Sequence, residues 1–337
     1  MASGILDIDL DAIAANWRAL DAMSPAHVQT AVMVKADGYG LGAAPVARAL
    51  MAHGARRFFV ALTEEGVALR LSLGPDAEIN ILSGHMSGDS ERIRAFNLIP
   101  MLNSRAQIER HFAALPDHPF GIQLETGMNR LGIDAADWAM LAPAVIPRKP
   151  RLLMSHMACA DDPEHPQNRA QLRRFREIKD SLRLPPRLRG GRTLFSLAAS
   201  SSIFLGGDYH FDLARPGAAL YGINPTMGAE NPLRPTVRLQ AKILQLRDVD
   251  LNMSVGYGAS HQFRGPSVLA TIGIGYADGF FRSLGNRGAV FVDGRQAPIV
   301  GRVSMDLITI DVGHLPRESV RPGMLVDIIG PQQSIDT

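Results

Sequence analysis

Short apolar runs that alternate with helical patterns fill the first two-thirds of the chain and constrain its fold most strongly. We predict strands near residues 30–34, 58–62, 78–83, 99–103, 120–125, 151–156, 193–197 and 211–215. Helical spacing of apolar residues lies between them, for example at 43–55, 64–73, 90–97, 104–114 and 167–182. Such alternation predicts a parallel sheet covered by helices. Eight strands, without Gly-x-Gly-x-x-Gly after the first, favour an α/β fold of the (β/α)₈ TIM-type barrel over an open doubly wound sheet.

The pattern changes after about residue 221, where helical spacing gives way to strand-like runs. These runs lie at 237–246, 268–274, 289–292, 308–312 and 325–329. Between two of them, Asp293-Gly294 predicts a hairpin turn. We therefore expect a barrel over residues 9–227 and a mostly β C-terminal domain over residues 228–337.

Composition and charge narrow the function classes. The chain has 337 residues, a hydrophobic fraction of 46% and a net charge of only +2, which argues against a nucleic-acid binder. The Arg-rich stretch 183–192 contains prolines and glycines and predicts a solvated loop. The lone Cys159 excludes an intramolecular disulfide and suits a reducing compartment. Without a basic start or a long apolar run, we expect a cytoplasmic protein with no signal peptide and no membrane contact.

A lysine follows the first predicted strand directly. The strand at 30–34 is short and apolar, and Lys35 precedes a loop with Gly38, Gly40 and Gly42. An amine held on a rigid element and partly desolvated has a lowered pKa, as a Schiff-base lysine requires. On this stretch alone, a lysine that leaves the strand for solvent explains the pattern equally well.

The barrel geometry groups this lysine with residues far away in sequence. Barrel active sites lie at the C-terminal ends of the strands, and phosphate often binds beyond strands seven and eight. Ser200 follows the seventh predicted strand, and the segment 215–222 follows the eighth, which neighbours the first in a closed barrel. A ligand with a phosphate near Ser200, Gly217 and Ala218 could present an aldehyde to Lys35. Pyridoxal phosphate has this form.

The segment from Val34 to Gly42 resembles the pyridoxal-phosphate lysine motif of the alanine racemase family, and further similar segments extend over about residues 5–331. The resemblance implies a barrel followed by a β domain that residues 1–8 join as its first strand. It implies that Lys35 forms an aldimine with pyridoxal 5'-phosphate, that Tyr39 lines the cofactor, and that no metal is needed. Spacing to Arg215 in the family favours Ser200 over its neighbours 201 and 202 as the phosphate ligand.

The resemblance also implies roles for three further residues of the barrel. Arg215, in a segment similar to Arg-Pro-Gly-x-x-Leu-Tyr-Gly, would face the pyridine nitrogen. Because arginine stays protonated, its hydrogen bond keeps that nitrogen unprotonated, which favours racemisation over transamination. His156 would orient Arg215 and the catalytic tyrosine. Arg130, in a segment similar to Thr-Gly-Met-x-Arg-Leu-Gly, would contact the cofactor's phenolic oxygen and the substrate carboxylate.

The chain departs from the family at one position beside Arg130. Many relatives carry a lysine seven residues earlier, modified to a carbamate that braces the arginine. This chain has Gln123 there, so no carbamate is expected. A bound anion and the glutamine amide remain alternative braces.

The predicted β domain carries the remaining site residues. The segment 254–259 is similar to the family's catalytic tyrosine segment and contains Tyr257; a tyrosine in a Gly-rich turn is the alternative. The resemblance implies that Tyr276 gates the entrance and that the Met305 amide meets the substrate carboxylate. It also implies a homodimer in which Tyr257 reaches the partner's barrel, so that each active site is completed in trans.

With these residues, the resemblance implies an alanine racemase that supplies D-alanine for peptidoglycan. Lys35 and Tyr257 would be the two bases on opposite faces of one aldimine. The small pocket expected among Tyr39, Tyr257 and Tyr276 suits alanine, but motifs do not exclude a racemase of serine. A non-catalytic pyridoxal-phosphate-binding barrel would lack the β domain. A barrel-type decarboxylase would usually carry a cysteine late in the chain, whereas Cys159 lies in the barrel.

Relatives in the family usually continue for a few dozen residues beyond the segment that corresponds to 326–331 and contribute a tyrosine to the phosphate site. The present sequence has six residues after 331. We therefore expect that contact to be missing or made differently.

Overall fold

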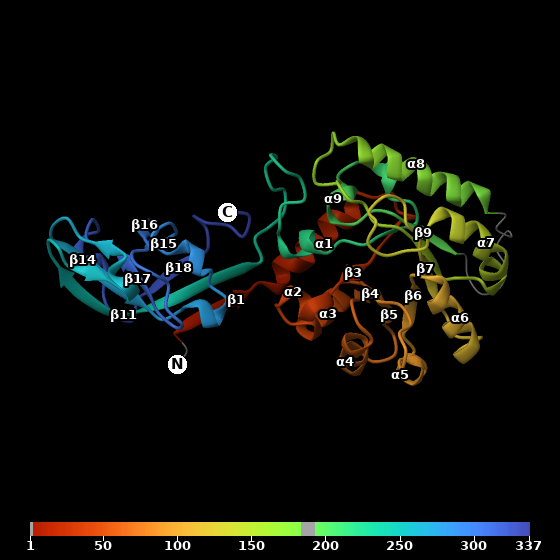
Figure 1. Ribbon diagram of the computed structural model, residues 1–337, viewed down its shortest axis with the longest axis horizontal. Helices are drawn as coiled ribbons and strands as arrows, with labels where there is room; N and C mark the ends of the chain where they lie inside the picture. The colour runs from red at the N-terminus through yellow and green to blue at the C-terminus, as the bar shows by residue number, and fades with distance from the viewer. Residues whose placement is uncertain (1–2, 183–192) are drawn as a thin grey trace. The chain divides into compact units, whose positions relative to one another are not determined.

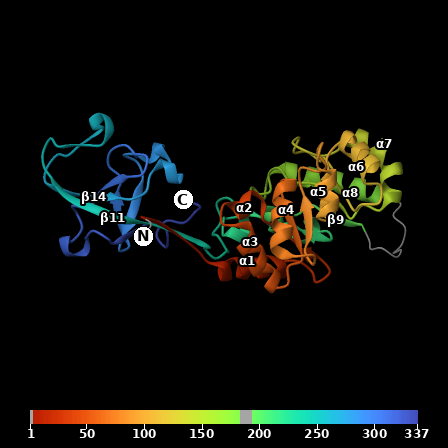
Figure 2. The ribbon, with the colours of Figure 1, turned by 90° about the horizontal axis from the view of Figure 1, so that it is seen from below.

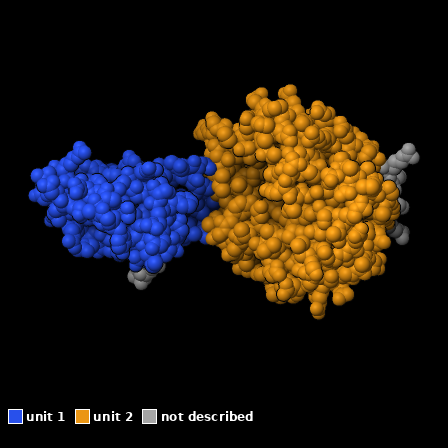
Figure 3. Space-filling model, in the orientation of Figure 1, with its two compact units in different colours: residues 1–9, 236–337 blue, residues 10–235 orange. Residues whose placement is uncertain are grey.

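The computed structural model describes residues 3–182 and 193–337, which form two compact units (Figure 1, Figure 3). One unit comprises residues 10–235, and the other comprises residues 1–9 and 236–337. The Arg-rich loop expected at 183–192 lies outside the described residues.

The expected boundary at residue 228 is eight residues too early. The chain before residue 236 still packs on the first barrel helix, α1 (Leu10–Ala22). The Asn16 side chain of α1 donates to the Arg234 carbonyl at 2.9 Å and accepts from the Arg234 N–H at 2.8 Å. These two bonds hold the linker against the barrel, although its composition resembles a free loop.

Parallel strands form a closed barrel in the larger unit. The strands are β2 (Gln29–Thr30), β3 (Val32–Met33), β4 (Arg57–Val60), β5 (Glu78–Ile81), β6 (Ile99–Leu102), β7 (Gly121–Gln123), β8 (Leu152–Met154), β9 (Leu194–Ser196) and β10 (Leu213–Ala214). Strands β3 to β9 form one parallel sheet in sequence order, and β10 pairs with β2. The Arg215 N–H donates to the Ala198 carbonyl at 2.9 Å, which joins the segment after β10 to the one after β9. With β2 and β3 as one interrupted strand, the predicted (β/α)₈ barrel is confirmed.

The helices lie on the outside of these strands (Figure 1, Figure 2). After α1 they are α2 (Lys35–Tyr39), α3 (Ala43–Ala52), α4 (Thr63–Leu73), α5 (Ser90–Ala95), α6 (Arg105–Ala114), α7 (Ala135–Val145), α8 (Pro166–Ser181) and α9 (Ser200–Ile203). Short 3₁₀ turns follow at η1 (Ile146–Arg148), η2 (Gly207–Tyr209) and η3 (Ala218–Tyr221). Helix α8 shows the packing rule: it buries Leu172 and Phe175 on one stripe, while most of its charged residues stay exposed. None of the described helices is long and apolar enough to cross a membrane.

The smaller unit is built around an antiparallel sheet. Its strands are β1 (Gly4–Ile8), β11 (Val237–Val249), β12 (Ser254–Val255), β13 (His261–Gln262), β14 (Ser267–Ile272), β15 (Ala289–Val292), β16 (Arg295–Pro298), β17 (Ile308–Asp311) and β18 (Leu325–Ile329). The main order is β16-β15-β18-β11-β14-β17, and β1 also pairs with β11. Strands β15 and β16 form the hairpin predicted at Asp293-Gly294, where both residues have positive φ (48° and 74°).

Two buried histidines, His85 and His111 of α6, form a hydrogen-bond network with the Ser90 hydroxyl and the His118 backbone carbonyl. The Nδ1 atoms of His85 and His111 lie 3.1 Å apart, and His85 Nε2 lies 2.8 Å from the Ser90 hydroxyl. His111 Nε2 lies 3.2 Å from the His118 carbonyl. Burial is the main cause that lowers the pKa of His111 to about 4, and it also lowers the pKa of His85. The folded barrel therefore favours the neutral forms of His85 and His111.

We predict that this network makes the barrel acid-sensitive. Because the folded pKa of His111 lies below its ordinary value of 6.5, the unfolded chain binds more protons between those two values. The free energy of unfolding is therefore unaffected by protonation of His111 above pH 6.5. It falls by on the order of 3 kcal/mol as the pH drops towards 4. Urea unfolding followed by tryptophan fluorescence measures it, since both tryptophans, Trp17 and Trp138, lie in the barrel unit.

The comparison uses His111→Gln, with exposed His27→Gln of the same unit as the matched control. The first variant should be less stable at pH 7 but lose less stability on acidification than the wild type. An unchanged pH slope in His111→Gln would contradict the prediction.

Candidate active site

Lys35 stands at the start of an unusual turn at the C-terminal end of β3. The next four residues all have positive φ: Ala36 (52°), Asp37 (51°), Gly38 (64°) and Tyr39 (59°). This is one turn of left-handed helix, a conformation that costs about 1–2 kcal/mol for each residue other than glycine. The sequence predicts only a loop with glycines here. The turn fixes the backbone from which the Lys35 amine projects.

The surroundings of Lys35 favour its neutral amine. Burial is the main cause that lowers the pKa of Lys35, the positive charge of Arg130 lowers it further, and the Glu65 carboxylate opposes both. A lowered pKa leaves more of the amine free of its proton at neutral pH, as a nucleophile or base needs.

Ser200 and the turn after β10 form a cluster of hydrogen-bond donors. The backbone N–H groups of Gly217 and Ala219 both donate to the Ser200 hydroxyl oxygen, at 2.9 and 3.1 Å. A Cβ built on Gly217 would lie 2.2 Å from the Tyr39 hydroxyl, so no larger residue fits without displacing that ring. Convergent amides and a hydroxyl are the groups that bind phosphate. Gly217, one of the predicted phosphate ligands, belongs to this cluster, and Ala218, the other, lies in the same turn between Gly217 and Ala219. Their role as phosphate ligands stays a prediction.

Arg215 is buried without an acidic partner. Its side chain is 2% exposed, Nη1 donates to the Ser196 hydroxyl, and Nη2 donates to the Ser155 carbonyl at 2.6 Å. No ion pair of Arg215 occurs in the described part of the chain. Burial lowers its pKa to about 10, so the guanidinium is still charged at neutral pH. An unpaired buried charge is costly, which makes a functional role the better explanation.

A buried polar chain extends from Arg215 to helix α8. The Ser155 hydroxyl lies 2.7 Å from the Thr126 hydroxyl, to which Gln171 Nε2 donates at 3.1 Å. The same Nε2 donates to the His156 carbonyl at 2.9 Å. Gln171 therefore ties the loop after β7 to the loop after β8. The motifs do not point to Gln171, although a glutamine directly before Leu172 on the buried stripe of a helix is a signal that the sequence carries.

His156 lies among the cationic groups. Burial is the main cause that lowers its pKa to about 3, and the charges of Arg215, Arg130 and Lys35 lower it further. His156 is therefore neutral throughout the physiological range and can orient neighbours without adding another charge.

Arg130 projects from a loop that closes on itself at both ends. The Glu125 carboxylate accepts the backbone N–H groups of Met128 and Asn129 at 2.7 and 2.8 Å. Gln123 Nε2 donates to the Leu131 carbonyl at 3.3 Å. The glutamine amide thus contacts the backbone next to Arg130, whose side chain is exposed.

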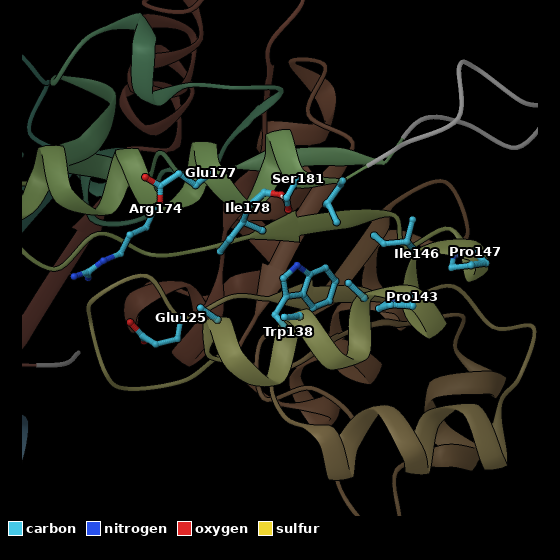
Figure 4. Close-up of a pocket in the computed structure, with 13 residues that line it drawn as sticks. Glu125, Trp138, Pro143, Ile146, Pro147, Arg174, Glu177, Ile178 and Ser181 are labelled. Atoms are coloured by element: carbon cyan, nitrogen blue, oxygen red, sulfur yellow. Dashed lines mark hydrogen bonds between the residues drawn. The ribbon is translucent and has the colours of Figure 1, made fainter.

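A groove of about 710 Å³ lies on the outer side of the same loop, between α7 and α8 (Figure 4). Its lining is mostly apolar and includes Trp138 and Ile178, with Glu125 and Arg174 at one end. Arg174 donates to the Thr126 carbonyl at 2.9 Å. The groove contains none of the predicted catalytic or cofactor residues, and its polar end supports the Arg130 loop.

The other three predicted residues belong to the smaller unit. Tyr257 is 72% exposed at the start of a 3₁₀ turn, η4 (Tyr257–Ala259). Tyr276 and Met305 come from two adjacent segments: the Tyr276 N–H donates to the Ser304 carbonyl at 3.0 Å, and the Ala277 N–H donates to the Met305 carbonyl at 2.8 Å. The structure therefore brings Tyr276 and the segment of Met305 together. Both side chains are exposed.

Comparison with known proteins accounts for this arrangement. Residues 8–225 match the family model for the alanine racemase N-terminal domain, and residues 236–337 match that for the C-terminal domain. The chain belongs to the alanine racemase family. The resemblance inferred from the lysine, arginine and tyrosine motifs is thereby confirmed.

Individual relatives are similar over the whole of this chain and about nine-tenths of their own length. The alanine racemase of Dinoroseobacter shibae is 50% identical over 336 residues, which cover 100% of this chain and 91% of the relative. The alanine racemase structure from Bartonella henselae is described with covalently bound pyridoxal phosphate. It is 38% identical, with a TM-score of 0.92, and the match covers 99% of this chain and 92% of the Bartonella chain. The biosynthetic enzyme from Pseudomonas aeruginosa has a TM-score of 0.89 and 33% identity, with coverage of 100% and 92%.

The contact between Gly217 and Tyr39 generates a stability prediction. Gly217→Ala should lower the free energy of unfolding by about 1–3 kcal/mol, because its Cβ overlaps the Tyr39 hydroxyl. Adding Tyr39→Phe removes that oxygen and should recover part of the loss. Thermal unfolding of both single variants and the double variant measures the coupling. Strictly additive effects would show that the two residues do not meet as described.

Proposed function

We propose that this protein is an alanine racemase that uses pyridoxal phosphate to interconvert L-alanine and D-alanine. One observation carries the proposal. Lys35, Arg215 and the Ser200 donor cluster lie at the C-terminal ends of neighbouring barrel strands, where a barrel binds its substrate. Family membership and the similarity to alanine racemases, which covers 100% of this chain and 91% of the relative from Dinoroseobacter shibae, support the same reaction.

The residues present fit the cofactor. Ser200 and the backbone amides of Gly217 and Ala218 would hold the phosphate, since the Ser200 hydroxyl already lies 2.9 Å from the Gly217 amide in this turn. The missing Cβ of Gly217 leaves its backbone close to the turn of Lys35 and Tyr39. Lys35 would hold the cofactor covalently through its amine. Arg215 would donate to the pyridine nitrogen, and Arg130 would bind an anionic oxygen of cofactor or substrate.

Side chains of this protein transfer the proton. When bound, pyridoxal phosphate withdraws electrons from the substrate and makes its Cα hydrogen acidic. Lys35 Nζ, with its lowered pKa, exchanges that proton on one face of Cα. The Tyr257 hydroxyl exchanges it on the opposite face, which gives inversion. His156 stays neutral and orients Arg215, which donates to the cofactor ring and accepts no proton.

The proposal includes a homodimer in which the smaller unit of each chain completes the partner's barrel site. Its support is the exposure of Tyr257, Tyr276 and Met305, three side chains with assigned roles that remain open to another molecule. The proposed setting is the cytoplasm, with D-alanine supplied for peptidoglycan.

Turnover of L-alanine in deuterated water, with added pyridoxal phosphate, tests the reaction directly. We expect D-alanine that carries deuterium at Cα, because the base that delivers the proton has exchanged with solvent. L-serine assayed in parallel should react more slowly, since the tyrosines leave a small pocket. Exchange without D-alanine, or no exchange at all, would contradict the racemase assignment.

Mixed dimers test whether sites are completed in trans. Lys35→Ala and Tyr257→Phe should each be nearly inactive alone. If the two chains are unfolded and refolded together, half of the dimers are mixed, and each has one site with both native residues. Roughly a quarter of all sites, and of wild-type activity, should return. No recovery in verified mixed dimers would place Tyr257 and Lys35 of one site in the same chain.

A further inference from the structure

The Glu65 carboxylate lies against the turn that carries Lys35. Glu65 belongs to the first turn of α4, and its Oε1 accepts the Ala36 N–H at 2.7 Å. Its Oε2 accepts the N–H groups of Ala61 and Leu62, directly after β4, at 2.6 and 3.1 Å. One side chain thus links the end of β4 to the residue after Lys35.

The bond to Ala36 fixes Lys35 itself. The Ala36 N–H belongs to the peptide group that follows Lys35, so its orientation determines the ψ angle of the lysine. Inside the turn, the Gly38 N–H donates to the Val34 carbonyl and the Gly40 N–H donates to the Ala36 carbonyl, both at 2.9 Å. The turn makes these bonds in the left-handed conformation, which its non-glycine residues disfavour. A contact from outside the turn is needed to hold it.

We propose that Glu65 is a positioning residue for Lys35: its carboxylate clamps the left-handed turn to the end of β4 and so fixes the place of the reactive amine. The inference rests on the proposed function, in which Lys35 holds the cofactor. Glu65 does not exchange a proton with the substrate in this account.

The chemistry of the contact explains why a carboxylate is needed. Both oxygens accept backbone N–H groups, and a carboxylate is the side-chain group with two acceptors and no donor. An amide at this position would point its NH₂ group at one of these N–H donors. The negative charge of Glu65 also raises the pKa of Lys35, whereas burial and the charge of Arg130 lower it. The charge of Lys35 in turn lowers the pKa of His156. Glu65 thus limits how far the amine's pKa falls.

The test compares Glu65→Gln with Glu64→Gln. Glu64 is the neighbouring residue on α4, exposed and paired with Arg92 at the surface, so it is a matched control. Hydrogen exchange of the segment 34–42, measured without cofactor, reports the clamp. Borohydride reduction with pyridoxal phosphate, followed by peptide mass mapping, reports attachment at Lys35.

We expect exchange of the segment 34–42 to become about tenfold faster in Glu65→Gln, because a charged acceptor is lost. We also expect weaker cofactor affinity, a lower pKa of the Lys35 amine in its pH-dependent modification, and no change in Glu64→Gln. A folded Glu65→Gln protein with wild-type exchange and affinity would overturn the proposal.

A second variant covers the case in which Glu65→Gln does not fold. Glu65→Asp keeps the charge and both acceptors but is shorter by one methylene, so exchange of 34–42 should still rise while the Lys35 pKa changes less. Wild-type exchange in Glu65→Asp would overturn the clamp. If borohydride attaches no cofactor to Lys35 in the wild type, the proposed function fails instead, whatever the exchange shows.

Discussion

The charged guanidinium of Arg215, buried among neutral oxygens, is the interaction on which the site depends. A buried cation is normally paired with a carboxylate, and here the Ser196 hydroxyl and the Ser155 carbonyl take that place. Neutral acceptors orient the group without cancelling its charge. The field of Arg215 therefore acts on whatever occupies the mouth of the barrel.

The charges of Arg215 and Arg130 influence the protonation states of their neighbours and the kind of ligand that the site attracts. The charges of Arg215 and Arg130, added to burial, keep His156 neutral, and Arg130 adds to the burial that makes the Lys35 amine easier to deprotonate. Cations gathered at the end of a barrel attract an anionic ligand, and both the phosphate of the cofactor and the carboxylate of an amino acid are anionic. Gln171 makes the arrangement rigid, because one buried amide holds the loops after β7 and β8 together.

Strand periodicity and motif spacing predicted the barrel, the hairpin at 293–294 and the positions of Lys35, Ser200 and Arg215 at strand ends. They did not predict the left-handed turn after Lys35, because three of its four residues are not glycine and local preference opposes it. The contacts of Glu65 and Gln171 were also missed, since each joins elements that are brought together only by the closed barrel. The boundary at 228 failed because Asn16 binds Arg234 across a large sequence separation.

In the proposed function, Arg215 remains a charged donor towards the cofactor ring. Nuclear magnetic resonance of the holoprotein, loaded with pyridoxal phosphate labelled with ¹⁵N in its ring, measures this most directly. This role of Arg215 predicts the chemical shift of an unprotonated, hydrogen-bonded pyridine nitrogen at neutral pH. It also predicts a shift towards the protonated form in Arg215→Glu. A protonated ring nitrogen in the wild-type protein would contradict it.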